Sequence, residues 1–359
     1  MVATLISVLL LGFLVIVHEV GHLLVARASG VRILRFSVGF GPRLFAWRRG
    51  HTEYVVSAIP LGGYVKMAGE QHTDAAEPWE YFAKPIGVRA RIVFAGPLVN
   101  YLVSLASLWV VFLIGYPELL PVVGKVMDRM PAQAAGLKSG DRIQAIDGRV
   151  TRTWDEMMEV IQESAERPRT FQIDRGGVPQ TVTITPKAQP GTDFFGRNRA
   201  VGRIGIAASG AFQTSRVGPL AALGRTLAEQ SKWAGKTLLG FWYLLTGQLS
   251  MRESVTGPIG IMVITSEAVR MGVSPVLLLI SLFSLSLAIF NLIPIPILDG
   301  GHLFFLALEK LRGRPVSLNI QERAVQVSFV LLMALVVTVC INDISRFELL
   351  KKLGGLVGR

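Results

Sequence analysis

The feature that most constrains this chain is an apolar run, Val2 to Val25, that carries two histidines and a carboxylate: His18, Glu19 and His22. In a helix, His18 and His22 lie one turn apart on one face. Both imidazoles then reach a single tetrahedral Zn²⁺, with Glu19 beside them as a base for water. Ionisable groups inside a membrane span cost about 2.5–3.5 kcal/mol each, and a bound zinc ion offsets that cost. The alternative is a polar helix face that is buried against other helices.

Composition and segment length indicate a polytopic membrane protein with a soluble part. Of the 359 residues, 51% are hydrophobic and only 17% are charged, which is apolar for a soluble protein. A helix needs about 20 apolar residues to cross about 30 Å of hydrocarbon. Four segments come near that length: Val2 to Val25, Ile92 to Tyr116, Pro275 to Ile293, and Val325 to Ile341.

The net charge of +12 could suggest nucleic acid as a partner. The basic residues, however, lie beside the spans without interleaved stacking aromatics, so membrane lipid is the predicted counter-charge and no nucleic acid is expected. Arg and Lys outnumber acids between the first two spans, which predicts that this loop and the active site face the cytoplasm. The region from Pro117 to about Ser274 then lies outside.

Two further features of the N-terminal part bear on the site. The segment Val31 to Lys66 is broken by glycines between β-prone runs, which predicts a small sheet of hairpins. Its spacing suits an ordinary surface hairpin as well as an edge to which an extended peptide could pair. Asn100 is a polar group in the second span, where it either packs helices together or acts beside the metal.

From Leu119 to near Ser209 the composition is that of a soluble module. Thr153 and Glu156 form a capping box that opens a helix, and Gly176-Gly177 joins two strands in a hairpin. From Pro219 to Leu249, charged residues at helical spacing alternate with apolar ones. This pattern predicts an amphipathic helix on the membrane surface, with insertion of residues 220–249 as the alternative.

A third metal ligand is expected where the third span breaks. The stretch from Asn291 to His302 has two prolines that forbid a continuous helix and two glycines that allow tight turns. Asp299 is its one carboxylate, and a catalytic zinc needs three protein ligands plus an open position. We therefore assign His18, His22 and Asp299 to the metal. The alternative for Asp299 is a turn former or helix cap. His302 is the runner-up ligand, but it is expected to pack or to lie beside the ligands.

The chain resembles the site-2 protease family of intramembrane zinc metalloproteases, most closely its branch of bacterial regulators of sigma-E. The resemblance rests on motifs that follow one another along nearly the whole chain: residues 18–22, Phe40-Gly41-Pro42, residues 60–67, Gly96-Pro97 with Asn100, Gly257-Pro258-Ile259, and residues 291–301.

The resemblance implies a zinc metalloendopeptidase of the bacterial inner membrane that acts in regulated intramembrane proteolysis and the stress response. Its substrates would be single-pass proteins, such as anti-sigma factors after a first cleavage, and remnant signal peptides. The module from Leu119 to Ser209 would be a single periplasmic PDZ domain that binds exposed C-termini of trimmed substrates, where the well-studied branch has two such domains. Substrate would contact Asn291, Gly62, Gly63, Tyr64 and Asn100, and the PDZ groove would include Ile204, Gly205 and Ile206.

The predicted fold class is a polytopic α-helical membrane protein of about four transmembrane helices, with a small membrane-associated β-hairpin region and an inserted α+β PDZ domain. Four parts are expected: an N-terminal membrane core (1–118), the PDZ domain (119–210), an amphipathic helical segment (211–274) and a C-terminal membrane core (275–359).

Overall fold

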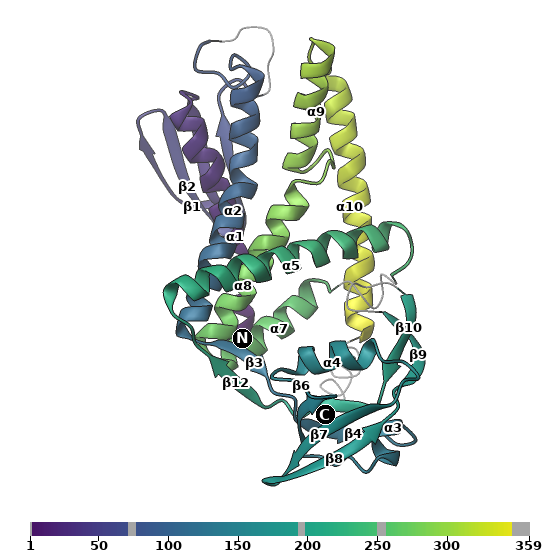
Figure 1. The fold of residues 1–359 in the computed structure, drawn as a ribbon. Coiled ribbons are helices and arrows are strands. Elements are labelled where there is room, and N and C mark those ends of the chain that lie inside the picture. Colours follow the sequence, from purple (N-terminus) through teal and green to yellow (C-terminus); the bar gives the residue numbers. More distant parts are fainter. Residues whose placement is uncertain (1, 71–76, 193–197, 250–255, 347–359) are drawn as a thin grey trace, which may run out of the picture. The chain divides into compact units, whose positions relative to one another are not determined.

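The computed structural model describes residues 2–70, 77–192, 198–249 and 256–346 (Figure 1). The chain divides into two compact units. The first, here called the membrane unit, comprises Met1–Val110, Thr226–Ala234 and Ser254–Arg359, and the second, the inserted unit, comprises Val111–Arg225 and Gly235–Glu253. The predicted division into four parts stays a prediction.

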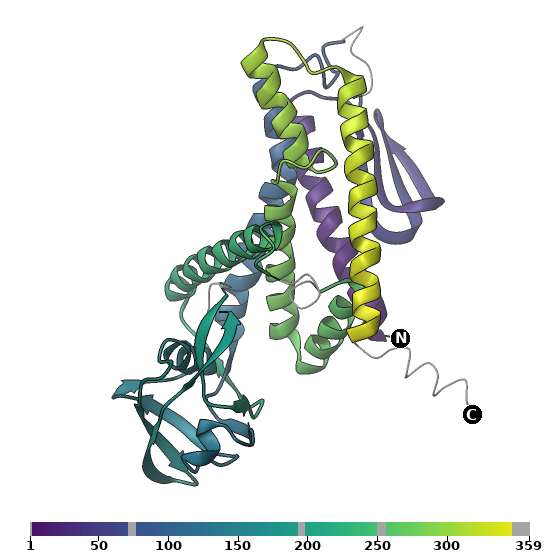
Figure 2. The same cartoon turned by 90° about the vertical axis from the view of Figure 1, so that its right-hand side faces the viewer.

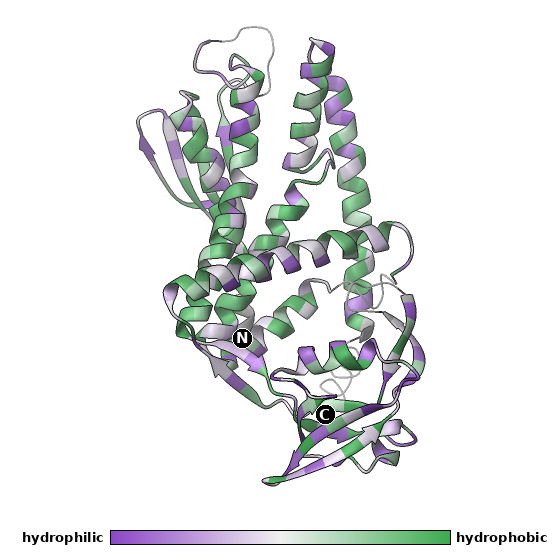
Figure 3. Cartoon of the chain, viewed as in Figure 1, coloured by the Kyte–Doolittle hydropathy of each residue, from purple (hydrophilic) through white to green (hydrophobic). Residues whose placement is uncertain are grey.

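The membrane unit is built mainly from helices: α1 (Val2–Ala28), α2 (Ile86–Ile114), α7 (Pro258–Met271), α8 (Val273–Asn291), α9 (Asp299–Arg312) and α10 (Leu318–Arg346). Figure 2 shows the course of the long helices from a second side, and apolar residues cover much of them (Figure 3). In the described residues, four helices are long and apolar enough to cross a membrane: Leu5–Ala28, Ile86–Ile114, Val273–Asn291 and Leu318–Ile344. The predicted number and order of spans are thereby confirmed.

The second and fourth helices begin earlier than the apolar runs predicted. The second continues through Arg89 and Arg91, and the fourth through Glu322 and Arg323. The apolar run that a hydropathy pattern detects ends at the first charged residue. The helix itself continues past that residue, because Arg and Glu are good helix formers and need only a polar partner or water.

The predicted sheet is present between α1 and α2 as two long antiparallel strands, β1 (Ile33–Arg49) and β2 (Thr52–Met67). The pairing is irregular, since Arg35 of β1 lies opposite both Lys66 and Glu53. The two strands therefore fold over into four runs, and residues 63–67 form one edge. The sheet packs on the helices through a shared apolar cluster: Leu23, Ala26, Val31, Ile33, Phe36, Met67, Tyr81, Ile92, Val93 and Leu306.

The inserted unit contains α3 (Pro131–Ala134), α4 (Trp154–Gln162) and strands β3 (Tyr116–Leu119), β4 (Val123–Val126), β5 (Arg142–Ile146), β6 (Arg149–Val150), β7 (Arg169–Arg175), β8 (Val178–Ile184), β9 (Lys187–Thr192), β10 (Asn198–Arg203), β11 (Ile206–Ala208) and β12 (Phe212–Ser215). Its main sheet has the order β6-β5-β7-β8 and covers an apolar core that includes Ile143, Met157 and Phe171. The capping box is confirmed, since Thr153 Oγ1 accepts from the Glu156 amide at 3.2 Å. The predicted hairpin is β7 and β8.

Helix α5 (Pro219–Leu245) combines an exposed apolar side with buried polar residues. Thr226 and Gln230, one turn apart, are fully buried within the membrane unit. Gln230 Nε2 donates to Ser104 Oγ at 2.6 Å and to Ser281 Oγ at 3.2 Å. The position of α5 at the membrane surface stays a prediction.

Candidate active site

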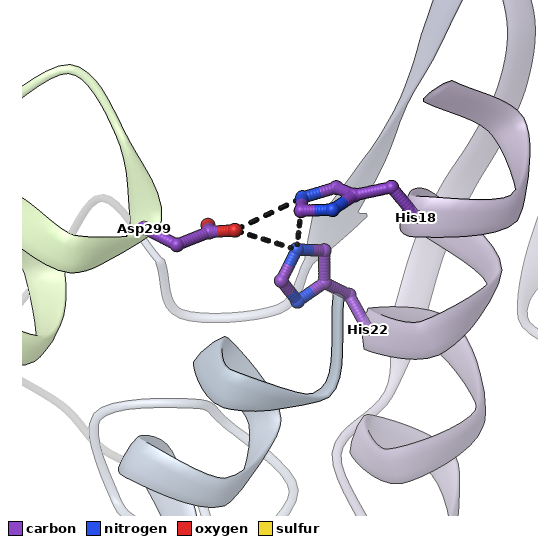
Figure 4. Close-up of side chains that lie close together, drawn as sticks. All are labelled: His18, His22 and Asp299. Carbon is purple, nitrogen blue, oxygen red and sulfur yellow. Dashed lines mark hydrogen bonds and ion pairs between the residues drawn. The ribbon is translucent and has the colours of Figure 1, made fainter. Parts of the chain in front are cut away.

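Three side chains from two distant parts of the sequence converge in the membrane unit (Figure 4). His18 and His22 lie one turn apart on α1, and Asp299 is the first residue of α9. Asp299 Oδ2 lies 2.9 Å from His18 Nε2 and 3.5 Å from His22 Nε2, and the two Nε2 atoms are 3.1 Å apart. Tetrahedral ligands on bonds of about 2.0–2.1 Å are about 3.3 Å apart. The three atoms therefore have the spacing of a zinc site.

The surroundings of these atoms also fit a zinc ion. Apart from the two histidine Nε2 atoms, the buried Asp299 Oδ2 has no hydrogen-bond partner among the described residues. A Cβ at Gly96 would lie 2.4 Å from His22 Nε2 and 2.7 Å from His18 Nε2, so glycine keeps this space open. His22 Nδ1 lies 2.8 Å from the Ile92 carbonyl, to which it donates, and this leaves the Nε2 lone pair for a metal.

The break after α8 places Asp299. Pro294 and Pro296 follow the end of α8 and prevent continuation of the helix. A Cβ at Gly300 would lie 2.2 Å from the Ile293 carbonyl oxygen, and one at Gly301 would lie 2.4 Å from the Ile295 oxygen. Both glycines are thus required for α9 to begin directly against this loop, with Asp299 at its N-terminus.

At its other end, α9 is held by a buried ion pair. The Arg89 guanidinium of α2 contacts both carboxylate oxygens of Glu309, with Nη1 3.1 Å from Oε2. Arg89 Nε also donates to the Lys84 carbonyl at 3.1 Å. Because the two arginine contacts are bidentate, they set the orientation of α9 as well as its distance from α2.

The three side chains open on a cavity of about 710 Å³, which Glu19 also lines. Glu19 Oε2 accepts from the Val65 amide at 3.2 Å, and the Met67 amide donates to Glu70 Oε2 at the same distance. Val65 and Met67 belong to the edge run of β2. Their outward amides therefore point into the cavity, beside the carboxylate of Glu19.

The other predicted substrate contacts are placed differently. Tyr64 lines the cavity. Gly62, with φ of +104°, packs against Phe40, and a Cβ at Gly63 would lie 2.4 Å from the Ser37 carbonyl oxygen, so both glycines shape the folded strand pair. Asn291 ends α8 and is not part of the cavity lining as far as the described residues show. Asn100 is fully buried, with Nδ2 3.4 Å from His18 Nδ1.

The predicted PDZ groove residues lie in the inserted unit. Ile204 is 2% exposed and belongs to the apolar core, and its carbonyl accepts from the Ala132 amide at 2.8 Å. Gly205 has a φ of +81°, which favours glycine. Ile206 begins β11, which pairs with β4.

Several cavity residues were not predicted. His302, expected to pack or to lie beside the ligands, with a ligand role as the alternative, lines the cavity outside the cluster of three. Burial raises the pKa of Glu70, which lines the same cavity. The cavity-lining residues of α10 could have been predicted from the sequence, because polar residues at helical spacing stand at the start of an otherwise apolar helix. The unpredicted lining residues are Val65, Met67, Glu70, Tyr81, Phe82, Val93, Leu318, Gln321, Glu322, Val325 and Gln326.

Comparison with known proteins agrees with this geometry. Residues 6–335 match the family described as peptidase family M50. A zinc metalloprotease of Rhizobium meliloti is 37% identical over 356 residues, which covers 94% of each chain. The zinc metalloprotease RasP of Geobacillus kaustophilus is 31% identical, covering 95% of this chain and 97% of its own. The regulator of sigma-E protease RseP of Escherichia coli is 29% identical, covering 94% and 97%.

Among solved structures, the PDZ domain of an SdrC-like protein from Listeria monocytogenes is 27% identical, with a TM-score of 0.20, and covers 24% of this chain and 84% of that one. The family match spans most of the chain and includes His18, His22 and Asp299. The protein is therefore a zinc metallopeptidase of the membrane, and the chain belongs to peptidase family M50, the site-2 proteases.

Proposed function

We propose that this protease hydrolyses peptide bonds within transmembrane segments of single-pass proteins, such as anti-sigma factors after a first cleavage, and remnant signal peptides. The observation that carries the proposal is the position of the site. His18 and His22 lie on a helix that is long and apolar enough to span a membrane, and they face a carboxylate from another helix. A site built there suits a substrate that is itself in the membrane.

His18, His22 and Asp299 are the proposed zinc ligands, and Glu19 is the proposed general base. A bound zinc ion would polarise the scissile carbonyl and lower the pKa of water to about 7. Glu19 would accept the proton of the attacking water and then pass it to the leaving amine. Its place in the cavity wall next to both histidines supports this role.

Substrate is proposed to bind as an extended strand along the edge of β2. A peptide bond inside a membrane helix is already hydrogen-bonded, so cleavage requires local unwinding and new partners for the freed backbone. The amides of Val65 and Met67 donate to Glu19 and Glu70, which line the cavity, and a substrate carbonyl would replace those carboxylates as the acceptor. Tyr64 and Asn291 are proposed to contact the substrate, and Gly62 and Gly63 to shape the strand that receives it.

The inserted unit is proposed to be a periplasmic PDZ domain that binds exposed C-termini of trimmed substrates, with Ile204, Gly205 and Ile206 at its groove. The basic loop between the first two spans supports an active site toward the cytoplasmic side of the inner membrane. Strand β11, which begins at Ile206, pairs with β4, and a bound C-terminus would extend this pair as a further strand.

A pair of reporters tests the proposal. One carries a transmembrane segment, and the other carries the same flanking sequences without it. Purified full-length protein in detergent should cut only the first, and chelation of zinc should stop the reaction. Equal cleavage of both reporters would indicate a surface enzyme for water-soluble peptides. No cleavage of either by zinc-loaded protein would favour a non-proteolytic scaffold.

A further inference from the structure

We propose that Asn100 is a positioning residue that holds the zinc ligand His18 by accepting a hydrogen bond from its Nδ1–H. The inference rests on the proposed role of His18 as a zinc ligand. This role differs from the predicted contact of Asn100 with substrate, because Asn100 is fully buried and His18 is only 7% exposed. Asn100 Nδ2 is placed 3.4 Å from His18 Nδ1, while its Oδ1 is buried without a hydrogen-bond partner.

Protonation chemistry decides which amide atom faces the ring. His18 Nε2 lies 2.9 Å from Asp299 Oδ2, in the cluster proposed to hold zinc. When Nε2 gives its lone pair to a cation, the neutral imidazole carries its proton on Nδ1 and can only donate there. An amide NH₂ also only donates, so the two groups cannot bond. The nitrogen and oxygen of an asparagine amide exchange positions by a turn of 180°. That turn gives Nδ1–H an acceptor and gives the orphaned Oδ1 a donor.

Both histidines then use their Nδ1–H group in the same way, as a hydrogen-bond donor to α2. His22 Nδ1 donates to the Ile92 carbonyl at 2.8 Å, and His18 Nδ1 donates to the Asn100 side chain. Both acceptors come from α2, two turns of helix apart. This helix therefore fixes the tautomer and the ring orientation of both imidazoles, while its Gly96 keeps the space between them open.

The backbone of Asn100 is separately fixed. Ser284 Oγ of α8 donates to the Asn100 carbonyl at 2.7 Å. One turn further along α2, Ser104 Oγ donates to the Ser281 carbonyl at 2.6 Å, and Ser281 Oγ donates to the Ser104 carbonyl at 2.8 Å. A substitution of the Asn100 side chain leaves these α2–α8 bonds in place. The effect of such a substitution on zinc affinity can therefore be separated from an effect on helix packing.

Three variants of the full-length protein test the inference through zinc affinity, measured by competition with a chromophoric chelator. Asn100→Leu keeps the volume but removes the acceptor, and should weaken zinc binding by about 10–100-fold. Asn100→Asp keeps an acceptor in the same place and should stay within about 10-fold of the parent protein. Ser104→Ala, the matched control one turn away, should leave zinc affinity unchanged. Parent affinity in Asn100→Leu, or loss in Asn100→Asp with retention in Asn100→Leu, would overturn the inference.

A second measurement is independent of whether Asn100→Asp folds. In ¹⁵N-histidine-labelled, zinc-loaded protein, the His18 ring should carry its proton on Nδ1, and that proton should exchange slowly with solvent. Exchange should become faster in Asn100→Leu and stay slow in Ser104→Ala. A His18 ring protonated on Nε2 would contradict the inference. If His18→Ala bound zinc as tightly as the parent, the proposed ligand set itself would be wrong. If only His18→Ala lost zinc, the ligand set would stand and the role of Asn100 would fail.

Discussion

The two units use buried polar side chains in opposite ways. In the inserted unit these groups mostly satisfy nearby backbone: Thr151 Oγ1 donates to the Ile143 carbonyl and Ser164 Oγ to the Val160 carbonyl, eight and four residues away. In the membrane unit they join distant helices. Ser104 and Ser281 are 177 residues apart, and Asn100 and Ser284 are 184 apart.

The difference follows from what surrounds each unit. Water drives the apolar side chains of the inserted unit into one core, which includes Phe171 and Ile173. Lipid gives no comparable drive, because it is as apolar as the side chains of a span, such as the half-exposed Leu9 and Phe13. Close packing of small residues and interhelical hydrogen bonds must then hold the membrane unit together. Four predictions, from the largest effect to the smallest, test this contrast.

The largest effect is expected from a substitution of Gly96, the glycine that lies against the proposed zinc ligands. In Gly96→Ala the new methyl group would occupy the space between the His18 and His22 rings. We expect zinc affinity to fall by at least about 100-fold, beyond the range of changes outside the ligand set. Gly87→Ala is the control in the same helix, because nothing lies within 4 Å of its Cβ position. Chelator competition measures both, and parent affinity in Gly96→Ala would show that the space is not used.

The buried ion pair between Arg89 and Glu309 should be costly to break. Their side chains are only 6% and 14% exposed, so Arg89→Met leaves an unpaired buried carboxylate. We expect the free energy of unfolding in detergent to fall by about 3–5 kcal/mol. The double variant Arg89→Met/Glu309→Leu should be less destabilised than either single one. Additive losses in the double variant would show that the two charges do not act as a pair.

A buried carboxylate should join α10 to α7. Asp343 is fully buried and accepts from the Gly257 amide at 3.1 Å and the Gly260 amide at 2.9 Å. Asp343→Leu leaves both donors without a partner, so the free energy of unfolding of the full chain should fall by about 1.5–3 kcal/mol or more. Thr338→Ala, which removes a local bond to the Ala334 carbonyl in the same helix, should change it much less. Equal effects would remove the distinction between local and interhelical bonds.

The smallest effect is expected in the inserted unit, as a pH dependence. Burial alone would raise the pKa of Asp141, but bonds from Arg175 and the Lys138 amide lower it below its ordinary value. The stabilisation is therefore present above the ordinary pKa of about 3.9 and is lost as pH falls through the lower folded value. Hydrogen exchange of β5 and β7 amides in the full chain should become faster over this acidic window. Asp141→Asn should show a flatter profile; an identical profile would exclude Asp141 as the cause.

The same contrast explains what the sequence could predict. The capping box at Thr153 and the β7–β8 hairpin were predictable because their contacts lie a few residues apart. The cluster of proposed zinc ligands was predictable because His18 and His22 share a helix face and Asp299 is the one carboxylate of its stretch. The contacts of Asn100 and the Arg89–Glu309 pair were not predictable, because they depend on which helix faces lie together. The pairing of one part of β1 with two parts of β2 was not predictable for the same reason.

The most direct test of the central claim compares the parent protein with Glu19→Gln on the transmembrane reporter, at equal measured zinc content. Glu19 lines the cavity beside the three proposed ligand side chains but is not one of them. Glutamine should therefore retain zinc and lower the cleavage rate by about 10²–10⁴-fold. Glu229→Gln, at a carboxylate paired with Lys232 on α5, is the control and should cleave at the parent rate. Undiminished cleavage by Glu19→Gln would contradict the assignment of Glu19 as the base and point to a contaminating protease.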